Sequence, residues 1–320
     1  LYLMTSSYSV GGTGCYIHMS NVKFFDYVDS ENIPMLSEEI SELQDHTFDN
    51  ANSINNYYGV RIPSLGKQKI GMKKLMNNAS CQAGAAYGGY YFQFTNYHTS
   101  MNVYSLVTNT LHSTVQMTTV STDHCNTVCF SNKFYDSNDD FPLLYTSGSQ
   151  TATYNHIQVW RIQLSSDVFT ITQVQEITLP TGTTGDSWNW GQAYLDNEAN
   201  FLWYSTMMSS GIYFRRFAIP AIFDSSDNVI SSVTLTEDDV KDSFTCIGCA
   251  NQQGGVVRNG ILYLLDGVPA WGTLTKLYVY DLWNKGLINI IDIYHLLGIT
   301  DEFEGCGIYN DTLIANTNGG

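Results

Sequence analysis

The chain has 320 residues, with 14 lysines and arginines against 30 aspartates and glutamates, and a formal net charge of −16. Because nucleic acids and anionic membranes attract basic surfaces, this balance argues against both as main partners. Charged residues make up only 14% of the sequence, while Tyr, Ser, Thr, Asn and Gly are abundant. Such a composition is typical of polar, β-rich proteins that are extracellular, exposed on virions or bind sugars.

The first 78 residues differ in pattern from the rest. Residues 1–30 are interpreted as the end of a β-sandwich or as a docked hairpin, and residues 31–78 as a helix and a polar linker. The helix is predicted over Pro34–Asp45, where apolar residues recur at i, i+4 and i+7. A linker helix is favoured over a short coiled-coil turn of a trimeric fibre. Because the chain starts with Leu1, we expect a piece of a longer protein, so the lack of a signal peptide decides little.

A strand–turn–strand unit recurs from about residue 79, most completely over Asp123–Gly148. There the sequence predicts a strand over Asn126–Phe130, a polar turn over Asp136–Asp140 and a strand over Leu143–Thr146. Asn, Asp or Gly turns lead into apolar strands that begin at residues 91, 143, 202, 262 and 313, which are 51 to 60 residues apart. A third strand follows the first four of these strands, and a fourth, outer strand is plausible in each unit.

Repeats of this length with four short strands predict an all-β fold, namely a five-bladed β-propeller over residues 79–320, with six blades as the alternative. The fifth unit stops where its third strand should begin. Either the C-terminus is truncated, or an N-terminal segment near residues 60–75 completes that blade and covers its edge.

Several motifs stand out in the repeats, namely His124–Phe130, Phe141–Ser147, Gln253–Gly255, Val279–Leu282 and Glu302–Gly320. They resemble motifs of propeller proteins of gut Bacteroidetes and their phages, which are minor structural or tail-fibre-like proteins. The likeness covers about residues 65–320 and departs at Phe303, where Pro is expected. The resemblance implies a propeller within a larger extracellular or virion protein, and it supplies no catalytic residues.

The chain contains seven cysteines: Cys15, Cys81, Cys125, Cys129, Cys246, Cys249 and Cys306. A disulfide-stapled secreted protein normally has an even number. Free, buried cysteines fit folding in a reducing cytoplasm, and a virion protein released by lysis fits both this and the surface composition. The spacings Cys125-x3-Cys129 and Cys246-x2-Cys249 also allow a zinc site, with the i and i+4 residues of a strand on one side. Small apolar filler is the favoured interpretation, so no metal or cofactor is predicted.

The start of each innermost propeller strand lines the mouth of the central tunnel, where residues from all blades converge. The candidate ligand-binding residues at these positions are His124, Asn126, Trp188, Trp190, Gln192, Gln253 and Glu304. Amides beside tryptophan suit sugar recognition, because rings stack on sugar faces and amides bind hydroxyls. The alternative is that these polar groups only satisfy one another and waters in the channel.

These observations favour a non-enzymatic structural or adhesion module of a phage tail or fibre apparatus, or a secreted homologue. A propeller face would bind another virion or surface protein or a surface glycan, and the N-terminal segment is a candidate for homo-oligomer contacts. The alternative is a glycan-active hydrolase or lyase with carboxylates at the tunnel mouth. Asp123, Asp186 and Glu304 would then act as general acid and as nucleophile or base, although their surrounding motifs match no such glycosidase family.

Overall fold

The computed structural model describes residues 81–95, 99–117, 124–147, 155–180, 189–208, 211–246, 249, 251–297, 301–310 and 312–318. All of these belong to one compact unit of the chain. The predicted hairpin in residues 1–30 and the helix over Pro34–Asp45 lie outside the described residues.

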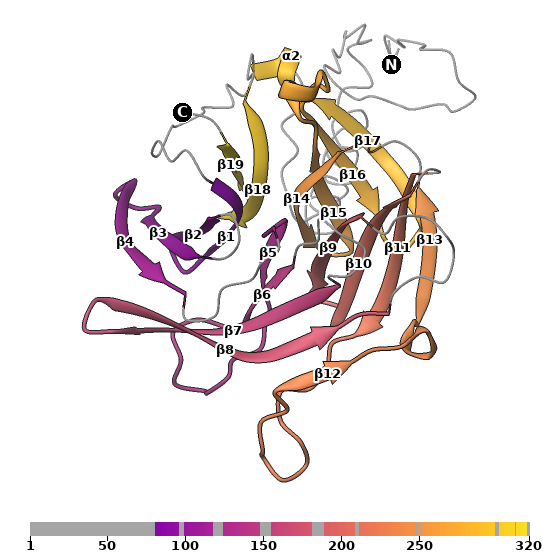
Figure 1. Cartoon of the computed structure of the whole chain (residues 1–320). Coiled ribbons are helices and arrows are strands. Elements are labelled where there is room, and N and C mark those ends of the chain that lie inside the picture. The colour runs from indigo at the N-terminus through magenta and orange to yellow at the C-terminus, as the bar shows by residue number, and fades with distance from the viewer. Residues whose placement is uncertain are drawn as a thin grey trace, which may run out of the picture. The chain divides into compact units, whose positions relative to one another are not determined.

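The strands form four sheets of four or five strands and one sheet of two (Figure 1). The first sheet contains β1 (Cys81–Tyr87), β2 (Tyr90–Thr95), β3 (Ser100–Ser105) and β4 (Thr110–Gln116). The second contains β5 (Thr127–Phe130), β6 (Leu144–Ser147), β7 (His156–Ser165), β8 (Val168–Thr178) and the parallel strand β12 (Ser232–Thr234). The third contains β9 (Asn189–Asp196), β10 (Phe201–Met208), β11 (Gly211–Ala218) and β13 (Asp242–Cys246). The fourth contains β14 (Gln252–Arg258), β15 (Ile261–Asp266), β16 (Lys276–Asp281) and β17 (Gly286–Asp292), and the last β18 (Glu302–Tyr309) and β19 (Thr312–Asn318). Short helical turns are η2 (Glu237–Asp239), η3 (Pro269–Trp271) and α2 (Ile293–Leu297).

The sheets have a propeller-like arrangement around their first strands (Figure 1). The inner strands β1, β5, β9, β14 and β18 contact one another in this order, and β18 also contacts β1. The predicted all-β, propeller-like fold is therefore confirmed. The blade count differs, since four sheets have a full set of strands where five or six blades are predicted. In the described residues the fifth repeat consists of the β18–β19 hairpin alone.

The repeats predicted from the sequence correspond to equivalent strands of successive sheets. The predicted strand starts fall in or next to β2, β6, β10, β15 and β19. A β-bulge recurs between the third and fourth strands of three sheets, each time at a valine followed by an aromatic residue: Val103–Tyr104, Val159–Trp160 and Val279–Tyr280. The units thus repeat in backbone detail as well as in sequence pattern.

The apolar core lies between successive sheets, which pack face to face. Four clusters fill the spaces from the first sheet to the β18–β19 hairpin. The indoles of Trp160 and Trp203 are completely buried in two of these clusters. Removing aromatic surface of this size from water supplies a large part of the driving force for folding.

The five cysteines whose side chains are described, Cys125, Cys129, Cys246, Cys249 and Cys306, are free and buried, as predicted. The expectation that Cys125 and Cys129 face the same side is wrong. Cys125 packs between the first and second sheets, and Cys129 between the second and third. Strand β5 begins only at Thr127, so the alternation of a strand does not extend back to Cys125.

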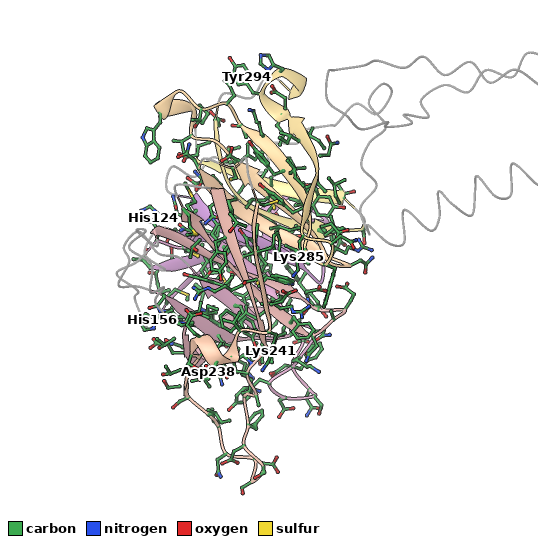
Figure 2. The ribbon with its side chains drawn as sticks, turned by 90° about the vertical axis from the view of Figure 1, so that its right-hand side faces the viewer. His124, His156, Asp238, Lys241, Lys285 and Tyr294 are labelled. Atoms are coloured by element: carbon green, nitrogen blue, oxygen red, sulfur yellow. The ribbon has the colours of Figure 1, made fainter. Side chains whose placement is uncertain are left out.

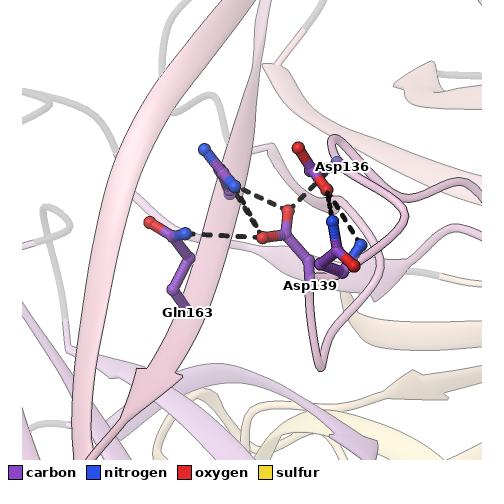
Figure 3. Close-up of polar contacts among 5 residues, drawn as sticks. Asp136, Asp139 and Gln163 are labelled. Atoms are coloured by element: carbon purple, nitrogen blue, oxygen red, sulfur yellow. Dashed lines mark hydrogen bonds and ion pairs between the residues drawn. The ribbon is translucent and has the colours of Figure 1, made fainter.

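The predicted polar turn over Asp136–Asp140 is part of the β5–β6 loop and is anchored on β7. The Asp139 carboxylate accepts hydrogen bonds from Arg161 Nε at 2.8 Å, from Nη2 at 2.7 Å and from Gln163 Nε2 at 3.4 Å (Figure 3). The Asp139 side chain is 3% exposed and that of Arg161 24%. The guanidinium also lies 4.6 Å from the centre of the Tyr135 ring. A charged acceptor with little water access therefore fixes this loop.

Glycines allow the inner strands to approach closely on either side of β18. A Cβ atom on Gly254 would lie 2.5 Å from the backbone oxygen of Glu304, and one on Gly305 would lie 2.3 Å from the backbone nitrogen of Gly84. Both neighbours are backbone atoms and cannot rotate away. The hydrogen atom of glycine is therefore required at these two positions.

We expect Asp139→Ala to lower the free energy of unfolding by about 1–3 kcal/mol, because Arg161 and Gln163 lose a charged, largely buried acceptor. Urea denaturation followed by circular dichroism measures the change. Asp136→Ala is the matched control, since the exposed Asp136 carboxylate accepts hydrogen bonds from its neighbour Asn138, and it should cost clearly less. Equal losses in the two variants would contradict the anchoring role of Asp139.

We expect Gly305→Ala to destabilise the protein by about 1–3 kcal/mol or more, because the added methyl group overlaps the backbone of β1. Gly286→Ala at the start of β17 is the control, since a Cβ there comes no closer than 3.9 Å to Asn284 O. The same denaturation experiment compares both variants. A Gly305→Ala protein as stable as the control would show that the inner strands are not held in this close approach.

Candidate functional site

The five inner strands all begin on one face of the unit, which we call the His124 face. His124 precedes β5, and His156 is the first residue of β7, which runs in the same direction as β5. Figure 2 shows both histidines toward one side and Lys285, from the β16–β17 turn, toward the other. Polar side chains at the strand starts therefore gather on the His124 face.

Four of the five inner strands contain a β-bulge at this end. At the bulge, β1, β9 and β14 each advance by three residues while the partner strand advances by two. In β18 the strand advances by two residues while β19 advances by one. Three of these bulges hold a polar residue directly before a small one, namely Gln82 in β1, Gln253 in β14 and Glu304 in β18. Because a bulge changes the direction of a side chain, it lets these residues turn away from the regular face of their sheet.

A chain of hydrogen bonds joins the inner strands β1 and β18 to the segment before β5. His124 Nδ1 lies 3.1 Å from Gln82 Oε1, and Gln82 Nε2 donates to Glu304 Oε1 at 3.3 Å. Gln82 is 7% exposed and Glu304 5%. Burial lowers the pKa of His124 below its ordinary value of 6.5. The imidazole is therefore neutral at pH 7 and presents both a donor and an acceptor.

A second pair of polar groups lies between β14 and β18. Gln253 Nε2 donates to Glu302 Oε1 at 2.7 Å, and both side chains are partly exposed. Burial raises the pKa of the Glu302 carboxyl above its ordinary value of 4.5, and the hydrogen bond from Gln253 opposes this shift. Glu302 thus leans toward β14, whereas Glu304, two residues later, leans toward β1.

Deeper polar residues are used inside the fold. Gln192 is completely buried; its Nε2 donates to Gln252 O at 2.9 Å and its Oε1 accepts from Tyr194 at 2.6 Å. Gln192 thus has hydrogen-bond partners within the fold, and its predicted role in ligand binding stays a prediction. Asn126 is 7% exposed, and its Nδ2 has no hydrogen-bond partner within the described part of the chain. A buried donor of this kind is suited to a bound water or ligand atom.

The structure brings together only part of the predicted site. It connects His124 to Glu304 through Gln82 and places Gln253 beside Glu302. Asp123, Asp186 and Trp188 lie outside the described residues, as does the side chain of Trp190.

The exposed Trp271 was missed by the sequence analysis. Its signal is the turn sequence around it, where Pro269 and Gly272 flank the tryptophan.

Within the described ranges, no three or more His, Cys, Asp or Glu side chains are grouped so that they could hold a metal ion. None of the described helices is long and apolar enough to span a membrane.

No protein-family model and no curated protein matches the chain. Matching solved structures include hydrazine synthase of Kuenenia stuttgartiensis, at 12% identity and a TM-score of 0.36, over 63% of this chain and 51% of that chain. Raptor of Chaetomium thermophilum matches at 10% identity and a TM-score of 0.38, over 76% of this chain and 27% of that chain. Glutaminyl cyclase of Myxococcus xanthus matches at 10% identity and a TM-score of 0.45, over 75% of this chain and 86% of that chain.

The chain therefore spans about half of the hydrazine synthase chain and about a quarter of the Raptor chain. At these identities and TM-scores the three proteins assign neither an activity nor a partner to this chain. The resemblance to Bacteroidetes and phage propeller proteins stays a prediction.

The lowered pKa of His124 predicts a pH-dependent stability. The unfolded chain binds this proton more readily than the folded one, so the stabilisation is present above pH 6.5 and is lost as the pH falls through the lowered pKa. We expect the wild type to lose more stability than His124→Gln between about pH 7 and about pH 5. Thermal denaturation across this range measures both. Parallel pH profiles would contradict the prediction.

Proposed function

We propose that this protein is a non-enzymatic adhesion module that uses its His124 face to bind a neutral, polyhydroxylated ligand such as a surface glycan. The observation that carries this proposal is the arrangement of amides and carboxylates from different inner strands, Gln82 with Glu304 and Gln253 with Glu302. Paired amides and carboxylates offer fixed donors and acceptors to hydroxyl groups. Their rigidity lowers the entropy lost on binding.

The wider setting is a proposal as well. A role in a phage tail or fibre apparatus, or in a secreted homologue, is supported by the polar, weakly charged composition and by the resemblance of the repeat motifs. Folding in a reducing cytoplasm before release is supported by the five free, buried cysteines. Other virion or surface proteins are the proposed protein partners, with homo-oligomer contacts through the N-terminal segment.

We also propose that the β18–β19 hairpin is the inner half of a fifth blade. It lies between β14 and β1, the inner strands of the fourth and first sheets. Asn316 on β19 accepts from the Tyr91 hydroxyl at 2.6 Å and donates to Gln82 O at 2.7 Å. The hairpin is thus joined to the first sheet as well as to the fourth, which supports a closed ring.

A glycan-active hydrolase or lyase is the second candidate. One observation favours it, since burial raises the pKa of the Glu302 carboxyl above its ordinary value, which is the direction that a general acid requires. Against it, Glu302 and Glu304 accept hydrogen bonds from amides on opposite sides of β18. A glycosidase needs two carboxylates facing one cleft, about 5–10 Å apart.

We expect the full chain to bind at least one member of a panel of dextran, mannan, xylan, arabinan and mucin glycans without cleaving it. Gln253→Ala should weaken that binding about tenfold, because one hydrogen-bonding group is lost and Glu302 is freed. Gln163→Ala is the matched control, since its amide also bonds a carboxylate, Asp139, but on β7 near the opposite face. Calorimetry measures binding, and a reducing-end assay measures cleavage.

Binding to none of these probes would overturn the adhesion proposal. Release of reducing ends that is abolished by Glu302→Gln would establish the hydrolase instead. Equal weakening by Gln253→Ala and Gln163→Ala would place the binding surface away from the His124 face.

A further inference from the structure

Trp271 is the most exposed described tryptophan, with 66% of its surface accessible. Trp160 and Trp203 are buried. Trp283 is 40% exposed, but it stacks with Arg216 at 4.5 Å and its Nε1 donates to Asp196 at 2.9 Å. Within the described part of the chain, the indole of Trp271 has no ring contact or hydrogen bond. An indole exposed to this extent offers a large apolar face against which a ligand can pack.

The turn that carries Trp271 is held rigidly. Val268 O accepts from Trp271 N at 2.8 Å, and Gly272 N donates to Pro269 O at 2.9 Å. The Thr273 hydroxyl accepts from Val268 N at 2.7 Å and donates to Val268 O at 3.0 Å. Gly272 has a positive φ of 82° that other residues rarely adopt. The indole is therefore presented on a fixed backbone, and little entropy is lost when it binds.

The same turn is tied to the start of β14, where the polar site lies. Asn251 Nδ2 donates to Thr273 Oγ1 at 3.2 Å, and Gly267 N donates to Asn251 O at 3.1 Å. Asn251 comes directly before Gln252 and Gln253. The turn connects β15 to β16, and the end of β15 pairs with the start of β14, Asp266 with Gln252. Trp271 therefore stands on the His124 face, at the outer side of the Gln253–Glu302 pair.

We propose that Trp271 is the stacking platform of the glycan site and extends it outward from Gln253 and Glu302 along the fourth sheet. An indole face packs against the C–H groups of a sugar ring, while neighbouring amides and carboxylates bind its hydroxyls. Leu274, three residues after the indole, is 37% exposed and adds apolar surface, while Asn251, Thr273 and Gln253 supply polar groups nearby. An apolar face beside polar groups suits a sugar ring, which presents both C–H groups and hydroxyls. This inference rests on the proposed function and adds the residue that positions the sugar ring.

The experiment titrates the full chain with the soluble members of the panel above, dextran, mannan, xylan and arabinan. Trp271→Ala should weaken the binding of the polysaccharide recognised by the wild type about tenfold, and Trp271→Phe should keep it within about threefold. Phe134→Ala is the matched control, since Phe134 is an aromatic residue 42% exposed in the β5–β6 loop near the opposite face. Thr273→Val keeps the indole but loses the hydroxyl bonds of the turn, so we expect an intermediate loss.

Tryptophan fluorescence gives an independent readout. The polysaccharide should shift the emission of the wild type to shorter wavelength, and this shift should be smaller in Trp271→Phe although the variant still binds. Unchanged binding by Trp271→Ala would overturn the platform and leave the proposed function intact. A wild type that binds no member of the panel would overturn both. Self-association lost in Trp271→Ala, measured by sedimentation, would assign the indole to a protein contact and overturn the glycan platform.

Discussion

The close approach of the inner strands around β18 is the constraint on which the rest of the structure depends. Gly305 stands against the backbone of β1, and Gly254 against the backbone of β18. With side chains at these positions the fourth sheet, the β18–β19 hairpin and the first sheet would be pushed apart. The clusters between the sheets would then lose the face-to-face packing that excludes water from their aromatic residues.

The candidate site follows from the same constraint. At these glycines the inner strands leave no room for side chains. The side chains of the polar residues next to them, such as Gln253 and Glu304, must therefore point in a direction that the regular alternation of a strand does not give. The bulges provide it, because an extra residue at the start of the strand turns the side chain out of the regular alternation. Hydrogen bonds then join side chains of different sheets, so the polar site depends on the contacts of β18 with β1 and β14.

Much of the fold could be predicted from the sequence, because hairpins are encoded locally by Asn, Asp or Gly turns between apolar runs. No bounds could be predicted for β4, whose sequence is polar and whose side chains are mostly exposed.

The candidate site was less predictable from the sequence than the fold. The direction of Gln82 depends on a bulge set by its register with β2, and the buried position of Gln192 depends on contacts with β14. The rigid display of Trp271 depends on Asn251, twenty residues earlier.

The carboxylates of the proposed glycan site already accept hydrogen bonds from amides. Glu304 is nearly buried and accepts from Gln82, and Glu302 accepts from Gln253. Each of these carboxylates keeps free lone pairs beside the amide hydrogen bond, so it can accept a second hydrogen bond from a sugar hydroxyl without rearrangement. Fixed acceptors beside an exposed indole are thus the arrangement on which the proposed glycan site rests.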